Sequence, residues 1–255
     1  MWSRRQIVCD GALVLLGGSV CPCLAQSSRH DAALGCTLTD TEATKIFNES
    51  TDTKLYITGN EPMIPKSGNK DFDFALAQTL AKISNLLDAT PGFAYYDDYD
   101  GMNAFASPRV RLSNADGTVL FGQNLLKRLM QGNDHPELGV AAVCAHEFGH
   151  ILQYKRGLTQ IVGAGQPTVK RVELQADFFA GYFAGTRKRE KPDFPAAVFA
   201  MTQYNFGDNM INHPSHHGTP NERAAAIVRG FEVAYAEKRN LADAISISIN
   251  YAKSL

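Results

Sequence analysis

One short pattern constrains the fold of this chain more than any other feature of its sequence. His146 and His150 flank Glu147 and two further residues, inside an apolar run from Leu138 to Leu152 that predicts a buried helix. On such a helix the two histidines lie about 40° apart on one face, and Glu147 flanks that face. Two imidazoles at this spacing can share one zinc ion and leave other coordination positions open. We therefore expect His146 and His150 to be zinc ligands and Glu147 to be a general base that does not bind the metal.

The alternative interpretation is a chance match that contains two hydrogen-bonded core histidines. Chance produces such a pentapeptide on the order of once in a hundred chains of this length. Burying two imidazoles and a carboxylate on one side of an apolar helix would also be costly without a purpose. Both arguments favour a metal site.

The third ligand has to come from a later part of the chain. An extended zinc signature would place glycine at position 153 and histidine at position 156, where this chain has Gln153 and Arg156. Glu173 and Asp177 are four residues apart in the apolar stretch Val172–Gly181, so one helix can present both carboxylates on the same face. We interpret Glu173 as the third ligand and Asp177 as the hydrogen-bond acceptor of a ligand histidine. The alternative, an exposed acidic face, fits poorly with the aromatic residues of this stretch.

The rest of the pattern predicts an α+β domain that is mostly helical. Apolar residues at helical spacing indicate a helix over Asp71–Asp88, and alternating residues around an Asp-Gly turn indicate a small antiparallel sheet. A cluster of three aspartates, at positions 97, 98 and 100, is interpreted as a solvated turn, because the spacing of a calcium loop is missing. The expected strands are 102–106, 109–112 and 118–121, with a weaker one at 55–58, and the further helices are 123–130, 138–156, 172–191, 196–204, 221–238 and 241–251.

The amino-terminal residues are typical of an export signal. Residues 1–25 contain Arg4 and Arg5, an apolar segment and small residues at a cleavage site, and they also resemble a twin-arginine signal. We expect three parts: the signal (1–25), a segment of uncertain structure (26–69) and a domain that carries the predicted zinc site (70–255). Cys36 and Cys144 would remain after cleavage, either as a disulfide or with Cys144 as a buried free thiol.

Composition narrows the classes of partner. The chain has 255 residues and a formal net charge of -1, which gives no indication of nucleic acid as a partner. It contains no run of eighteen apolar residues, so we expect no stable membrane span.

A loop rich in histidine, His213–Pro220, follows the two predicted metal helices. It could be surface turn material, or it could supply a competing metal ligand or an electrophile. We choose His217 as the electrophile, because Gly218 next to it frees the backbone to turn and Arg223 in the following helix can anchor it.

These pieces resemble the gluzincin metallopeptidases, in particular the bacterial neutral zinc metallopeptidases and, more loosely, the HtpX-like heat-shock proteases and prenyl-protein endopeptidases. The similarity rests on residues 146–153, on 173–181 and on His217-Gly218-Thr219 followed by Arg223, Gly230 and Phe231. Asn103, Ala104 and Phe105 are similar to the edge strand that precedes the metal helix in the HtpX-like branch. The HtpX-like and prenyl-protein enzymes carry transmembrane helices, which this chain lacks after its leader.

The resemblance implies a zincin-like fold, with zinc on His146, His150 and Glu173, Glu147 as base and His217 as hydrogen-bond donor to the oxyanion. We expect an exported, periplasmic or secreted zinc endopeptidase that holds a peptide or protein substrate along the strand at residues 103–105. Two alternatives stay open. One is a catalytically silent metal-binding or chaperone-like protein, and the other is a zinc hydrolase that acts on a non-peptide amide.

Overall fold

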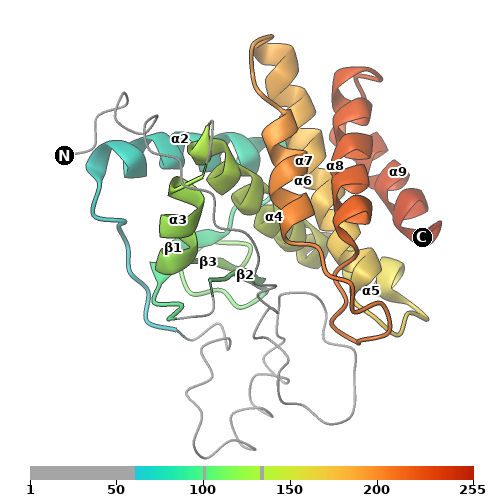
Figure 1. Cartoon of the computed structure of the whole chain (residues 1–255), viewed down its shortest axis with the longest axis horizontal. Coiled ribbons are helices and arrows are strands. Elements are labelled where there is room, and N and C mark those ends of the chain that lie inside the picture. The colour runs from blue at the N-terminus through green and yellow to red at the C-terminus, as the bar shows by residue number, and fades with distance from the viewer. Residues whose placement is uncertain (1–60, 100–101, 133–134) are drawn as a thin grey trace, which may run out of the picture.

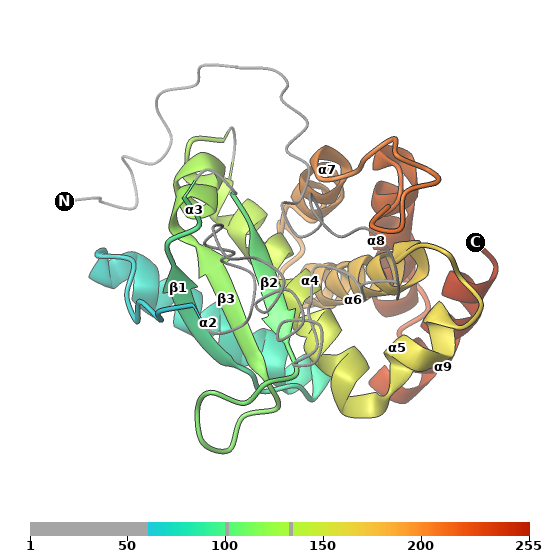
Figure 2. The same cartoon turned by 90° about the horizontal axis from the view of Figure 1, so that it is seen from below.

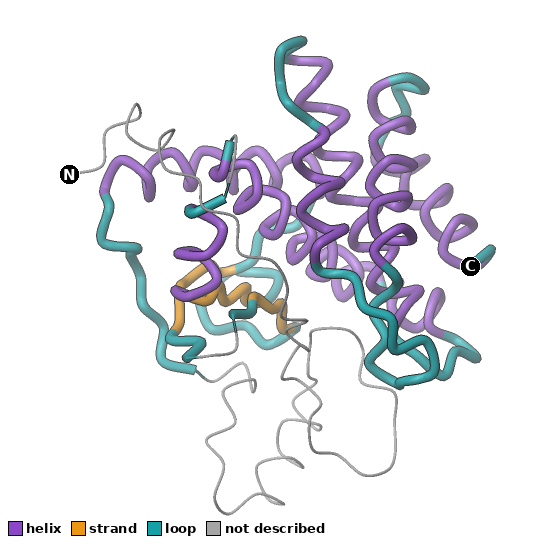
Figure 3. Tube along the Cα trace, in the orientation of Figure 1, coloured by secondary structure: helices purple, strands orange, loops and turns teal. Residues whose placement is uncertain are grey.

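The structure is a computed structural model that describes residues 61–99, 102–132 and 135–255. This part of the chain is α+β and mostly helical, as the sequence predicts (Figure 3). The export signal, the expected strand at 55–58 and Cys36 lie outside the described residues. Cys144 is a free thiol, fully buried, and burial raises its pKa above the ordinary range.

A mixed sheet of three strands lies beside the helices. Its strands are β1 (Gly92–Tyr96), β2 (Ala104–Ser107) and β3 (Thr118–Gly122), and their order is β1-β3-β2. β2 runs antiparallel to β3, but β1 runs parallel to it. The prediction of a purely antiparallel sheet is therefore wrong, and β1 was not predicted. Its short apolar run after a Pro-Gly turn lacks the alternation that marks a half-buried strand.

The expected strand at 109–112 does not form. The Thr118 side chain takes the place of a ladder there, since its Oγ1 donates to the Arg109 carbonyl at 2.7 Å and accepts from the Arg111 amide at 3.2 Å. The Arg111 side chain in turn donates to the Glu61 carbonyl at 2.6 Å. Side-chain hydrogen bonds that satisfy the backbone in this way compete with strand pairing.

Eight helices lie in the part of the chain that the structure describes (Figure 1). They are α2 (Lys70–Leu87), α3 (Gln123–Met130), α4 (Pro136–Arg156), α5 (Leu158–Gly163), α6 (Lys170–Glu190), α7 (Ala197–Asn205), α8 (Pro220–Tyr235) and α9 (Leu241–Lys253). All the helices predicted over described residues are present, with shifts of a few residues at their ends. The short α5 was not predicted.

Helix α4 is the central element of the fold. It contacts β2 and β3 on one side and α6 and α7 on the other, so it lies between the sheet and the other helices (Figure 2). Its residues from Gly139 to Gln153 are all buried, which confirms the buried helix that the apolar run predicts. It ends at Gly157, whose left-handed conformation (φ 62°) makes the C-cap, as predicted.

The aspartate cluster corrects another prediction. Asp98 is only 5% exposed, and its carboxylate accepts hydrogen bonds from the backbone amides of Asn124 at 2.8 Å and Leu125 at 3.0 Å. These amides are among the donors left open at the start of α3, so Asp98 caps that helix instead of facing solvent. A third amide, that of Asn103, donates to the same carboxylate at 3.2 Å. Sequence reasoning missed this role because Asp98 lies 26 residues before Asn124, far from the start of the helix in the sequence. Asp100 lies outside the described residues.

Helices α6 and α8 cross at very short range. A Cβ atom added to Gly230 of α8 would lie 1.9 Å from the Phe178 carbonyl oxygen, and one added to Gly181 of α6 would lie 2.0 Å from the Ile227 carbonyl oxygen. Only glycine allows two helix backbones to approach this closely. The crossing holds α6, which carries Glu173 and Asp177, against α8, which carries Arg223.

Candidate metal centre

His146, His150 and Glu173 come together as a buried group that could hold a metal ion. The histidines lie one turn apart on α4, with their Nε2 atoms 3.1 Å apart. Glu173 reaches them from the first turn of α6, with Oε2 3.3 Å from His146 Nε2 and Oε1 3.4 Å from His150 Nε2. The three residues that the sequence predicts as ligands are thus brought together by two helices.

The spacing of these atoms fits a small tetrahedral metal site. Zinc bonds to histidine nitrogen and carboxylate oxygen are about 2.0–2.2 Å long, and ligand atoms at tetrahedral angles around such an ion lie about 3.3–3.6 Å from one another. The two histidine nitrogens lie 3.1 Å apart, and each lies 3.3 or 3.4 Å from a different oxygen of Glu173, so these separations are close to that range. Two imidazoles and one carboxylate also form a donor set that zinc uses in catalytic sites.

His146 is backed by a chain of charged groups. Its Nδ1 lies 2.7 Å from Asp177 Oδ1, and Arg223 donates to Asp177 through Nε at 2.7 Å and Nη2 at 3.0 Å. Burial alone would lower the pKa of His146, but the Asp177 carboxylate raises it to about 9. Burial would raise the pKa of Asp177, and Arg223 and His146 instead hold it below its ordinary value. The sequence-based assignment of Asp177 as the acceptor for a ligand histidine agrees with this geometry.

The other two members of the group have charge states that suit metal binding. Burial lowers the pKa of His150 to about 4, so its ring is neutral at pH 7. Burial works in the opposite direction for Glu173, but the neighbouring His150, His146 and His217 hold its pKa well below the ordinary value. Neutral imidazole and ionised carboxylate are the forms that bind a metal, so His146 would have to release one ring proton when an ion binds.

Glu147, the predicted base, is buried on α4 directly after the first histidine. His217, the predicted electrophile, is also buried. His213 is exposed. The catalytic roles of Glu147 and His217 stay predictions.

Sequence reasoning missed Asp208, which holds the histidine loop. Its Oδ2 accepts from the His217 backbone amide at 2.9 Å and lies 3.6 Å from His217 Nδ1, while its Oδ1 lies 2.6 Å from His216 Nδ1. Burial would raise the pKa of Asp208, but its hydrogen bonds with His217 and His216 keep it below its ordinary value. No motif marks Asp208, since its role depends on how the loop folds back. Gln175, which accepts a hydrogen bond from Gln153, and Ser248, which accepts one from Gln175, were missed for the same reason.

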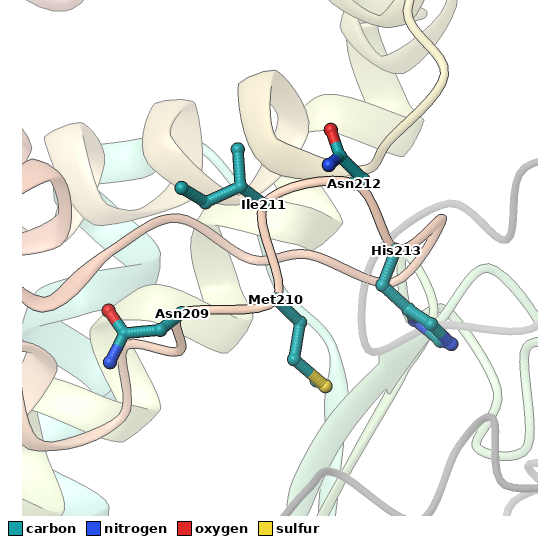
Figure 4. Close-up of a pocket in the computed structure, with 5 residues that line it drawn as sticks. All are labelled: Asn209, Met210, Ile211, Asn212 and His213. Atoms are coloured by element: carbon teal, nitrogen blue, oxygen red, sulfur yellow. The ribbon is translucent and has the colours of Figure 1, made fainter.

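The turn that leads into this loop, residues 209–213, lines an open hollow of about 500 Å³ (Figure 4). Met210 and His213 extend from the loop on one side, and Ile211 and Asn212 point elsewhere. None of the three candidate ligands lines this hollow, so it does not mark the metal centre.

The predicted substrate strand corresponds to β2 and the residue before it. β2 is an edge strand of the described sheet and contacts α4. Ala104 and Phe105 are buried, and the Asn103 carbonyl accepts from the Gly122 amide at 2.9 Å, so this segment is fixed to β3. Its part in substrate binding stays a prediction.

Comparisons with protein-family models, with curated proteins and with solved structures found no match for this chain. Within the described residues, no helix is long and apolar enough to cross a membrane.

Proposed function

We propose that this protein is a zinc-dependent endopeptidase of the gluzincin type, exported from the cytoplasm. The observation that carries the proposal is the buried group of His146, His150 and Glu173, whose nearest nitrogen and oxygen atoms lie 3.1–3.4 Å apart. Glu147 is buried on the same helix as the two histidines. It supports an enzyme over a silent binding site, because metal binding alone does not require a further carboxylate that is not a ligand. The export signal and the family resemblance remain proposals from the sequence.

Zinc bound there would supply Lewis acidity for a scissile carbonyl and would lower the pKa of a water molecule toward about 7. Glu147 would accept the proton of the attacking water and deliver it to the leaving amine. His217, oriented by Asp208, would donate a hydrogen bond to the tetrahedral oxyanion. The segment 103–105 would align an extended peptide by main-chain hydrogen bonds, which demand little of the substrate side chains.

The test uses the mature full-length chain loaded with zinc. We expect cleavage of casein or of a quenched peptide that stops on chelation and returns when zinc is restored. Glu147→Gln should bind zinc as the wild type does and lose cleavage, because an amide cannot accept the proton. Glu137→Gln is the matched control, since Glu137 is half-exposed at the start of the same helix, and it should cleave normally.

Two outcomes would contradict the proposal. If the purified protein takes up no zinc after reconstitution, the metal assignment is wrong. If it binds zinc and cleaves no peptide, the silent metal-binding protein or a hydrolase of non-peptide amides becomes the better explanation, and cell-wall peptide cross-links are the next substrates to assay.

A further inference from the structure

A row of buried polar side chains connects the metal centre to the last helix of the chain. Gln153 of α4, Gln175 of α6 and Ser248 of α9 are all fully buried. The Oε1 of Gln153 lies 2.8 Å from His150 Nδ1, and its Nε2 donates to Gln175 Oε1 at 2.9 Å. The Nε2 of Gln175 then donates to Ser248 Oγ at 3.0 Å. Buried amides are costly unless they are hydrogen-bonded, and each member of this row has partners.

Two backbone carbonyls fix the direction of every hydrogen bond in the row. Gln153 Nε2 also donates to the Val172 carbonyl at 2.8 Å, and the Ser248 hydroxyl donates to the Ile245 carbonyl at 2.7 Å. A carbonyl can only accept, so the Gln153 amide nitrogen must face Val172, and the Ser248 oxygen is left to accept from Gln175. Turning either amide over would place two acceptors or two donors against each other.

This direction determines which nitrogen of His150 carries the hydrogen. Gln153 presents a carbonyl oxygen to Nδ1, and such an oxygen only accepts, so Nδ1 must be the protonated nitrogen of the neutral ring. The lone pair of Nε2 then points to the place where His146 Nε2 and Glu173 Oε1 converge, 3.1 and 3.4 Å away. Without Gln153, the Glu173 carboxylate would favour the other tautomer, whose Nε2–H cannot bind a metal.

We propose that Gln153, held by Gln175 and Ser248, locks His150 in the Nδ1–H tautomer, so that the carboxy-terminal helix α9 sets the metal affinity of a site built on α4 and α6. Gln153 is a positioning residue in this scheme, and Ser248 acts through it from another helix. The inference rests on the metal centre of the proposed function but does not require peptidase activity.

The first measurement reads the tautomer in the metal-free full-length chain. Long-range ¹H–¹⁵N spectra distinguish a protonated from an unprotonated imidazole nitrogen, and assignment uses the loss of the His150 signals in His150→Gln. We expect Nδ1–H for His150 in the wild type and a shift toward Nε2–H in Gln153→Met, which keeps the chain length and removes the acceptor. A general loss of packing would not select one tautomer over the other.

The second measurement compares two serines of α9. Ser248→Ala removes the end of the row, whereas Ser246→Ala removes a similar bond, from Ser246 Oγ to the Ala242 carbonyl at 3.1 Å, on the exposed side of the same helix. Removing a group that supports a metal ligand typically weakens metal binding about 10–100-fold. Competition with a zinc-binding dye measures the zinc affinity of each variant. We expect Gln153→Met to bind zinc about 10–100-fold more weakly than the wild type and Ser248→Ala about tenfold more weakly. The zinc affinity of Ser246→Ala should be unchanged.

Each outcome decides the proposal. It is overturned if His150 keeps the Nδ1–H form in Gln153→Met, or if Ser248→Ala binds zinc as tightly as Ser246→Ala. Should Gln153→Met fail to fold, Ser248→Ala takes its place in the tautomer measurement, with a mixture of tautomers expected. If the wild type binds no zinc, the proposed function fails, but the metal-free spectra still judge the role of Gln153.

Discussion

The crossing of α6 and α8 gives a prediction whose size can be worked out from the structure. In Gly230→Ala the new methyl group would start 1.9 Å from the Phe178 carbonyl oxygen, and real contacts of this kind are not shorter than 3.0 Å, so the helices must separate locally by about 1.1 Å. Such overpacking typically costs about 1–3 kcal/mol, and the upper end applies because backbone atoms clash and no side chain can turn away. Alanine regains about 0.5–1 kcal/mol through its better helix propensity. We expect a net loss of about 2 kcal/mol in the free energy of unfolding.

Gly139→Ala is the matched control within another helix. Its methyl group would lie 3.5 Å from Thr202 Oγ1 and 3.6 Å from the Leu129 side chain, which are ordinary contacts. Here only the gain in helix propensity remains, so we expect stability to rise by up to about 1 kcal/mol. Urea unfolding followed by circular dichroism measures both variants, with an unchanged slope as the sign of comparable two-state transitions. The reasoning is refuted if Gly230→Ala is as stable as the wild type, or if both substitutions change stability in the same direction.

Three further predictions follow from the site and from α3. His217→Ala should lower kcat about a hundredfold or more with zinc content unchanged, as steady-state kinetics and elemental analysis would check, whereas loss of zinc would make His217 a ligand. Asp98→Ala should lower the free energy of unfolding in urea by about 1–3 kcal/mol, because it leaves two helix amides without their acceptor. Asp97→Ala, at an exposed position, should change the free energy of unfolding little. Removing zinc should lower the Tm by scanning calorimetry, since a metal that binds only the native state stabilises it, and an unchanged Tm would argue against a bound ion.

The sequence predicts those parts of the centre whose geometry one helix determines. His146 and His150 are related by a single turn of α4, and Glu173 and Asp177 by a single turn of α6, so helical periodicity was sufficient to place each pair on one face. The apolar surroundings of both pairs were sufficient to predict their burial, which the structure confirms.

Periodicity fails where a partner comes from a distant part of the chain or from a loop. Asp208, Gln175 and Ser248 have no spacing relation to the residues that they support, and only the tertiary fold brings them together. The prediction of an antiparallel sheet was wrong for a related reason. Whether β1 pairs parallel or antiparallel to β3 depends on the path of the chain between them, which the local pattern of residues 92–96 does not encode.

The histidine pair of α4 and the acidic pair of α6 come together because of one small residue between the two histidines. A Cβ atom at Gly149, between Phe148 and His150, would lie 3.1 Å from both the Cα and the carbonyl oxygen of Ala176 on α6. That distance is already tight, so any larger side chain at position 149 would move α6 away from α4. Glu173 and Asp177 lie near Ala176 on α6 and would move with it, which would lengthen the contacts of 3.3 and 3.4 Å that Glu173 makes with the two histidines. The glycine therefore keeps the distance between the two helices short, and Glu173 reaches the histidines because that distance is short.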